Sequence, residues 1–429
     1  MVTDTAELLP TRPARAAAPA PRRYGLRAAL MMTASGWSAN QFAALLGAYR
    51  AAGLSDAAVN ALLAVYAVGL IPGLLTAAPL ADRYGRRPVA LGALALNLAA
   101  TLLLMLGAGS AFWLAPGRLL TGVSAGALLA AGGAWVKELS SPPYAPAGTE
   151  TVAARRSGVF VSLGFASGGL SASLIAQWAP WPMVLAYLPH LVLAVLAGCL
   201  ARRSPETRPE GRPEGRTATG RGSARAADGR GGGTGFLRAV LPMAPWVFAA
   251  PMVGFATLPG LVDGGLTGWQ VVYAGVATAV VPGSGVAVQP LARRLSGRSR
   301  LFTGAAGLLV MAAGFVLAVP AAGYGQPVLG LVAGAVLGAG YGLALTYGLA
   351  TVAVLAAPAA LARLTSYFWS LAYLGMFAPL LLGALAAAFP MPWLLAATAG
   401  LAVLSCVLLV LLGRTRSGRL RPRSLRLRP

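Results

Sequence analysis

The chain has 429 residues, of which 57% are hydrophobic and only 10% are charged. Soluble domains carry about 25% charged residues, so the composition excludes a protein whose whole surface faces water. The net charge of +23 comes almost entirely from arginines, which lie in separate blocks between apolar stretches. This placement indicates membrane topology rather than a nucleic-acid-binding face.

Apolar stretches follow one another along the chain, and each is long enough to cross a bilayer as a helix of about 20 residues. Lipid cannot satisfy free backbone groups, and no stretch shows the alternating pattern of an outer-membrane barrel, so we predict a helix for each. The predicted fold is an all-α membrane protein with 12 transmembrane helices. The predicted spans are residues 28–49, 58–81, 88–108, 112–136, 156–178, 181–201, 240–262, 268–292, 301–321, 327–355, 363–388 and 391–413.

Three polar segments flank or divide these spans. Residues 1–27 form a basic N-terminal tail, residues 414–429 form a basic C-terminal tail, and residues 202–237 form a long insertion rich in Arg, Gly, Pro and Glu. The insertion has almost no large apolar residues, which predicts a disordered cytoplasmic linker. It separates two predicted six-helix bundles, residues 28–201 and 238–413.

The basic residues follow the topology that these spans require. With a cytoplasmic N-terminus, all but two of the 34 Lys and Arg residues lie in cytoplasmic segments; Arg50 falls in an outer loop and Arg118 within a span. Basic residues concentrate on the cytoplasmic side of membrane proteins, so both termini are predicted to be cytoplasmic. We expect a multi-pass protein of the plasma (inner) membrane, with the lipid bilayer as a partner and no nucleic acid.

The two predicted bundles share a short sequence at the same position. The tripeptide Pro-Leu-Ala occurs at 79–81, after the second span, and again at 290–292, after the eighth. Two six-helix halves related as parallel repeats form a recurring transporter architecture, with the substrate site between the halves near the midplane of the bilayer. The repeat therefore predicts two pseudo-symmetric bundles that share a central site.

The loop after the second span reads LADRYGRR at residues 80–87 and carries the most specific motif. It resembles the signature between helices 2 and 3 of the major facilitator superfamily, a family of transporters, although the glycine that begins that signature is absent. The resemblance implies a twelve-helix fold in which the aspartate meets the start of helix 11 of the opposite half when the transporter faces outward. The alternative is that Asp82 only offsets the charge of neighbouring arginines. The implied gating motif is Asp82, Arg83, Gly85, Arg86 and Arg87.

The fourth span carries Arg118, Gly122 and Gly126. They resemble the helix-4 motif of the same family, an arginine followed by glycines four and eight residues on. In proton-coupled exporters of the family this arginine is linked to proton transfer, so the resemblance implies a role in proton coupling. The glycines share one helical face and allow close packing. The alternative for Arg118 is that its side chain snorkels to the outer surface.

Two further features of the first bundle also favour a proton-coupled exporter. Gly164 and Gly168 resemble the glycine-rich helix-5 motif of exporters in this family, without its proline, and we expect them to pack closely against a neighbouring helix. His190, the only histidine, falls near the middle of the sixth span. An imidazole can carry a proton near neutral pH, so we assign His190 to proton coupling; the alternative is a neutral packing residue.

The spans contain no Asp, Glu or Lys at mid-depth, so the predicted substrate cavity is neutral and aromatic. Pockets for organic ligands are mostly apolar with a few placed polar groups. Such a cavity suits an uncharged or weakly cationic hydrophobic compound, because a sugar phosphate or a dicarboxylate would need facing basic residues. The residues predicted to line the cavity are Trp37, Asn40, Gln41, Trp246, Gln270, Tyr273, Tyr347, Tyr367 and Tyr373.

The favoured function is secondary active transport by alternating access, as a proton-driven exporter of a small hydrophobic drug or metabolite. We expect a monomer that uses the proton gradient and needs no cofactor. The alternative is an uptake permease, either a symporter or a facilitator, for a small neutral solute. A multispan membrane enzyme is a distant alternative, because a single histidine, no paired metal ligands and no phosphate-binding Gly-Lys-Ser/Thr loop leave little for catalysis.

Overall fold

The structure, a computed structural model, describes most of the chain, and every regular element within the described ranges is a helix. Most of the predicted tails and linker, at 1–22, 209–231 and 418–429, lies outside the described residues. The described residues are 23–146, 150–208, 232–356 and 361–417.

The first six predicted spans form one bundle, which we call the N-terminal half. A side-chain cap starts α3: the hydroxyl oxygen of Ser55 accepts a hydrogen bond from the backbone nitrogen of Ala58 at 3.2 Å. A π-helical turn joins α5 to α6 within the fourth span. The elements are α1 (Tyr24–Ala44), α2 (Leu46–Ala51), α3 (Asp56–Tyr84), α4 (Arg86–Leu106), α5 (Ala111–Ala127), α6 (Gly133–Glu138), α7 (Glu150–Trp178), α8 (Pro182–Leu185) and α9 (Leu188–Ala201).

The last six predicted spans form the C-terminal half. A second π-helical turn, η2 (Val253–Thr257), interrupts the seventh span, and a 3-10 turn, η5 (Leu374–Phe377), interrupts the eleventh. The α-helices are α11 (Gly232–Val240), α12 (Trp246–Met252), α13 (Leu258–Leu261), α14 (Gln270–Ala287), α15 (Gln289–Arg298), α16 (Arg300–Gly323), α17 (Pro327–Leu355), α18 (Leu361–Tyr373), α19 (Ala378–Leu385) and α20 (Met391–Ser417).

The described residues hold ten helices that are long and apolar enough to cross a membrane, together with a shorter apolar helix, Trp246–Leu261. The remaining predicted span is α1, which is long enough but less apolar because it carries several buried polar side chains. These are Thr33, Ser35, Ser38, Asn40 and Gln41. The predicted fold class, an all-α membrane protein with two six-helix bundles, is confirmed.

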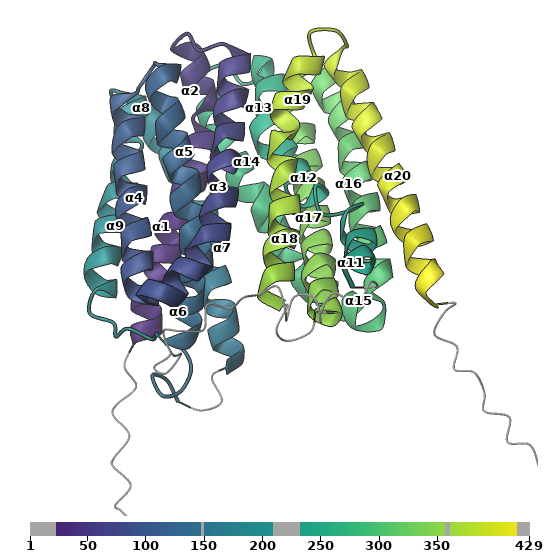
Figure 1. The fold of residues 1–429 in the computed structure, drawn as a ribbon. Coiled ribbons are helices and arrows are strands. Elements are labelled where there is room, and N and C mark those ends of the chain that lie inside the picture. Colours follow the sequence, from purple (N-terminus) through teal and green to yellow (C-terminus); the bar gives the residue numbers. More distant parts are fainter. Residues whose placement is uncertain (1–22, 147–149, 209–231, 357–360, 418–429) are drawn as a thin grey trace, which may run out of the picture.

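The two halves stand side by side, with the N-terminal half in purple to blue and the C-terminal half in green to yellow (Figure 1). Helix α1 begins and helix α20 ends at the same end of the molecule, which also carries α15 and the turn between α3 and α4 (Figure 1). We call this the basic end, because Arg83, Arg86 and Arg294 lie there. The other end is called the opposite end.

The halves contact each other directly at the opposite end. Gln177 Nε2 donates a hydrogen bond to the carbonyl oxygen of Gly268 at 2.7 Å, and the rings of Trp178 and Trp269 meet edge to face at 6.1 Å. Along α3, residues 59–71 are buried or half-buried except for Val68, whereas six of the nine residues 72–80 are exposed. Along α3, burial therefore decreases from the opposite end toward the basic end.

Candidate functional site

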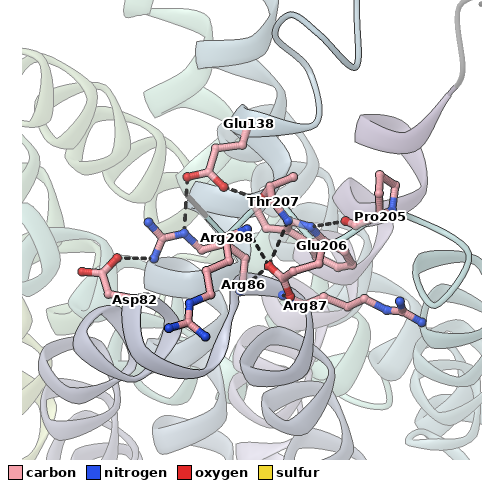
Figure 2. A network of polar contacts seen from close by, with 9 residues as sticks. Asp82, Arg86, Arg87, Glu138, Pro205, Glu206, Thr207 and Arg208 are labelled. Atoms are coloured by element: carbon pink, nitrogen blue, oxygen red, sulfur yellow. Dashed lines mark hydrogen bonds and ion pairs between the residues drawn. The ribbon is translucent and has the colours of Figure 1, made fainter. Parts of the chain in front are cut away.

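The predicted gating motif forms the turn between α3 and α4. Gly85 has a φ of 105°, a left-handed conformation that favours glycine, and it separates the two helices. Arg86 Nη1 donates to Asp82 Oδ1 at 2.6 Å, and Arg86 Nε donates to Glu138 Oε1 at 3.3 Å (Figure 2). Arg86 thus joins the end of the second span to the end of the fourth.

The carboxylate of Glu206, in the segment that follows the sixth span, closes this turn. Glu206 Oε1 accepts a hydrogen bond from the backbone nitrogen of Arg86 at 2.8 Å, and Oε2 accepts one from that of Arg87 at 3.0 Å (Figure 2). These are the first two amides of α4, which have no partner within the helix and lie at its positive end. A Cβ at Gly85 would lie 2.6 Å from Glu206 Oε2, so glycine is also needed for this close approach.

The start of the predicted linker is ordered against this loop. Trp135 Nε1 donates to the carbonyl oxygen of Pro205 at 3.0 Å, and the hydroxyl of Thr207 donates to Glu138 (Figure 2). The backbone nitrogens of Thr207 and Arg208 also donate to Glu206, at 2.9 and 3.0 Å. At its other end, residues 232–237 belong to α11. The predicted linker 202–237 is therefore structured at both ends, and 209–231 lies outside the described residues.

Three residues of this network were not predicted from the sequence: Glu138, Glu206 and Thr207. A signal was present, because the chain has only 11 acidic residues, and Glu138 and Glu206 lie a few residues beyond the predicted ends of spans, where arginines are concentrated. An acid at this end does not contribute to the positive-inside pattern, so it is expected to have a local partner, as Asp82 does.

Arg118, assigned to proton coupling, is buried within the N-terminal half with 1% of its surface exposed. Its Nε donates to the carbonyl oxygen of Leu62 at 3.1 Å, and its guanidinium lies between the rings of Phe42 and Tyr66, at 4.4 and 4.8 Å. This burial contradicts the snorkelling alternative. Among the described residues no carboxylate pairs with Arg118, and its Nη1 has no hydrogen-bond partner.

His190 belongs to a buried polar network in the same half. Its Nδ1 lies 2.9 Å from the hydroxyl oxygen of Thr101, which in turn donates to the carbonyl oxygen of Asn97 at 3.1 Å. Asn97 Nδ2 donates to the hydroxyl oxygens of Ser38 and Ser124, at 3.0 and 2.7 Å. The imidazole is fully buried and does not line either of the cavities described below.

The four glycines assigned to helix packing lie at crossings within the N-terminal half. A Cβ at Gly122 or Gly126 would lie 2.0 or 2.2 Å from a backbone oxygen of α3, and one at Gly164 would lie 2.1 Å from a backbone oxygen of α1. A Cβ at Gly168 would lie 2.7 Å from the Cα of Trp37. Each position therefore brings two helix backbones so close that a side chain cannot fit.

A small central pocket of 30 Å³ lies between the two halves, where α1, α3 and α7 face α12, η2 and the α18–η5 segment. On its C-terminal side the rings of Phe248 and Tyr373 stack with centroids 4.4 Å apart. No charged side chain lines it among the described residues. The lining residues are Ala39, Asn40, Ala43, Tyr66, Phe165, Phe248, Met252, Phe255, Tyr373 and Met376.

Of the predicted cavity residues, the structure brings Asn40 and Tyr373 to this pocket. Trp37 packs against the backbone of α7, and Gln41 is fully buried with no partner for its amide among the described residues. Tyr367 is 48% exposed on the outside of α18.

The other predicted cavity residues serve the C-terminal half itself. Trp246 Nε1 donates to the hydroxyl oxygen of Ser405 at 3.0 Å. The hydroxyl of Tyr347 donates to the carbonyl oxygen of Ala239 at 2.8 Å. The hydroxyl of Tyr273 donates to a carbonyl oxygen at the start of α17 at 2.7 Å. Gln270 lines a different cavity, described next.

A larger cavity of 420 Å³ lies at the opposite end, between α1–α2 of one half and η2, α13 and α14 of the other. Its polar lining includes Arg50, Asp263 and Gln270. Arg50 Nε pairs with Asp56 Oδ1 at 2.5 Å. Among the described residues, no group of three or more His, Cys, Asp or Glu side chains could hold a metal ion.

Comparison with known proteins places this geometry in a family. The family model of the Major Facilitator Superfamily matches residues 28–378. No curated protein matches the chain. At the identities below, similarity to solved structures shows the fold alone.

The fold is similar to that of a D-xylose–proton symporter, with 16% identity and a TM-score of 0.72, covering 90% of this chain and 96% of the symporter. It is similar to the peptide transporter POT, with 13% identity and a TM-score of 0.72, covering 91% and 94%. It is also similar to a bacterial homolog of the human lysosomal transporter Spinster in an inward-facing, unoccupied conformation, with 16% identity and a TM-score of 0.65, covering 91% and 95%.

The family match covers most of the chain, and the similar solved structures are transporters rather than enzymes. The signature loop, the two six-helix halves and the pocket between them agree with that match. The chain therefore belongs to the Major Facilitator Superfamily and is a multi-pass membrane transporter.

Proposed function

We propose that this transporter is a proton-driven exporter of small apolar compounds that are uncharged or weakly cationic. The observation that carries the proposal is the lining of the central pocket. Its walls are apolar and aromatic, and its polar side chains are the neutral Asn40, Tyr66 and Tyr373. Such a wall gains free energy by removing apolar surface from water and offers no counter-charge to an anion.

The basic end faces the cytoplasm in this proposal, because arginine-rich segments stay on the cytoplasmic side. The protein sits as a monomer in the plasma (inner) membrane. The contacts between the halves at the opposite end and the exposed second half of α3 then support a state in which the central pocket is closed to the outside and approached from the cytoplasm. An exporter takes up its cargo in this state.

The gating motif switches between two partners during the transport cycle. In the state described, Asp82 pairs with Arg86 of its own half, and its side chain is 55% exposed. When the basic end closes, Asp82 meets the start of α18 in the other half, where the positive end of the helix favours a carboxylate. The ion pairs around Arg86 keep Asp82 in place for that exchange.

Arg118 and His190 carry the coupling to protons. An arginine keeps its proton at physiological pH, so of these two side chains the imidazole of His190 is the one that can exchange a proton. Arg118 supplies a fixed positive charge inside the same half, with no carboxylate beside it among the described residues. Intramembrane charges of this kind are costly and are retained for function.

An uptake permease is the second candidate, because the similar structures include a D-xylose–proton symporter. A polar solute such as a sugar needs several hydrogen-bonding side chains, whereas most of the central pocket is apolar. The pocket lining therefore favours an apolar cargo over a sugar.

The direction is tested with everted inner-membrane vesicles, in which export from the cell becomes accumulation in the lumen. Respiring vesicles that contain the protein are given ethidium or acriflavine, with vesicles that lack the protein as the control. The proposal predicts accumulation in the acidic lumen that a protonophore abolishes. Protein-dependent depletion of the lumen would support uptake and reject export.

A further inference from the structure

Asn40 is the amide side chain of the central pocket. It lies on α1 with 2% of its surface exposed and lines the pocket beside Tyr66 and Tyr373. Its Nδ2 donates to the carbonyl oxygen of Phe165 on α7 at 2.9 Å and to that of Thr278 on α14 at 3.2 Å. The second bond crosses from the N-terminal half to the C-terminal half, so this amide also joins the two bundles.

The direction of this amide is fixed by its neighbours. Both partners of Nδ2 are carbonyl oxygens, which only accept hydrogen bonds. If the amide were turned over, Oδ1 would face two carbonyl oxygens, and the amide would make neither bond. Both N–H groups of Asn40 are therefore used, and Oδ1 is the atom left to the pocket. No described residue donates a hydrogen bond to it.

We infer that the central pocket selects apolar compounds that carry an N–H or O–H donor, and that Asn40 Oδ1 accepts the hydrogen bond from that donor. The inference rests on the proposed function, since it takes this pocket as the substrate site, and it adds the chemical class of the substrate. In the state described the pocket has room for about one water molecule, so the two halves must part to admit the ligand. The apolar body of the ligand then packs against side chains such as Phe248, Met252 and Phe255.

Discrimination follows from the cost of an unpaired buried acceptor. A ligand without a donor removes water from Oδ1 and gives nothing in return, so it binds less tightly than the same ligand with a donor. The hydroxyls of Tyr66 and Tyr373 do not discriminate in this way, because a hydroxyl can rotate to donate or to accept. The fixed polarity of Asn40 therefore sets the preference.

The test compares compounds that differ in one donor hydrogen. Indole with N-methylindole, carbazole with N-methylcarbazole, and diphenylamine with N-methyldiphenylamine are matched pairs. Their affinities for the purified full-length protein in detergent are obtained from the concentration dependence of ligand-induced thermal stabilisation. Each protein yields the ratio of the two affinities within a pair, so effects common to both members cancel.

Two variants accompany the wild type. Asn40→Leu keeps the shape of the side chain and removes the acceptor. Asn97→Leu is the matched control, because Asn97 is another buried asparagine of the same half, bonds Ser38 and Ser124, and does not line the pocket. The wild-type comparison uses no variant, so it decides the inference even if Asn40→Leu does not fold.

We expect the donor-bearing member of each pair to bind about tenfold more tightly to the wild type and to Asn97→Leu, and about equally to Asn40→Leu. Equal affinities in the wild type, a preference that survives in Asn40→Leu, or no binding by any member would overturn the inference. A donor preference in binding without proton-driven export in vesicles would instead reject the proposed function and keep the site.

Discussion

Glu206 Oε1 accepts a hydrogen bond from the backbone nitrogen of Arg86 at 2.8 Å, although 120 residues separate them in the sequence. The segment that follows the sixth span thus caps the start of α4, the helix of the third span. The same carboxylate bonds Arg87 and the first residues of the segment that connects the halves. The turn that carries the gating motif is therefore held by the start of that connecting segment.

The first prediction concerns this cap. Glu206→Ala leaves the first amides of α4 without a protein acceptor, so we expect the free energy of unfolding to fall by about 1–2 kcal/mol. Glu206→Gln keeps one acceptor and places an NH₂ group where Oε2 met Arg87, so its effect is smaller. The heat-unfolding midpoints of Glu206→Ala and Glu206→Gln in detergent are compared with that of the wild type. Asp263→Asn is the control, because Asp263 is an exposed acid at the opposite end. Equal midpoints for Glu206→Ala and the wild type would contradict the role of the cap.

The second prediction concerns the gate. Asp82→Asn removes an exposed ion pair, which contributes at most about 1 kcal/mol, so the protein still reaches the membrane with near-normal stability. Transport is nevertheless lost, because the carboxylate is needed when the basic end closes. Dye transport in vesicles, normalised to the amount of protein, measures this. Asp56→Asn removes the exposed pair with Arg50 at the opposite end and serves as the control. Near-normal transport by Asp82→Asn would remove its proposed gating role.

The third prediction concerns the buried cation. Arg118→Ala removes the charge and the contacts with Phe42 and Tyr66, so we expect substrate flux that no longer responds to the proton gradient. Arg118→Lys keeps the charge but loses the planar donor fork, and should retain part of the coupling. Flux is compared with and without a protonophore in the same vesicles. If Arg118→Ala keeps proton-driven flux at the wild-type level, Arg118 has only a packing role.

The fourth prediction concerns the packing of α7 against α14. A Cβ at Gly275 would lie 1.7 Å from the hydroxyl oxygen of Ser173, so Gly275→Val cannot keep this contact and should shift the protein toward the outward-open state. Gly283→Val is the matched control on the same helix, because no atom lies within 4 Å of its Cβ position.

The readout is a disulfide between cysteines placed at Gln177 and Gly268, which face each other across the halves at the opposite end. The yield should drop several-fold in Gly275→Val and stay unchanged in Gly283→Val. Equal yields in the two variants would show that the α7–α14 contact does not control closure. Cys199 and Cys406 are free thiols and are replaced by serine first.

The sequence was sufficient for the all-α membrane fold of two six-helix bundles, because hydropathy and arginine placement act on every span. It was less successful with the central pocket. Trp246 and Tyr347 were predicted to line the cavity, but both form hydrogen bonds within the C-terminal half. Phe248, which lies on α12 together with Trp246, lines the pocket instead. Lipid is as apolar as a helix interface, so hydropathy does not tell which face of a span meets the other half.

The linker shows a second limit. Its composition predicts disorder, and composition averages over a window, whereas Glu206 is ordered by specific bonds to two amides at the start of α4. Such a bond joins residues that are far apart in the sequence and depends on a helix end that is placed only by the fold. The sequence shows that Glu206 is an acid near arginines, but it does not show that the backbone nitrogens of Arg86 and Arg87 are its partners.

The central claim is that protons moving in one direction drive an apolar compound in the other. The most direct measurement uses the purified protein in proteoliposomes with an acidic lumen, ethidium outside, and the membrane potential held at zero by potassium and valinomycin. The account predicts uphill accumulation of ethidium in the lumen, with alkalinisation of the lumen that depends on ethidium, and neither effect with Asp82→Asn. Ethidium flux that is indifferent to the pH gradient, or accumulation in the alkaline compartment, would contradict it.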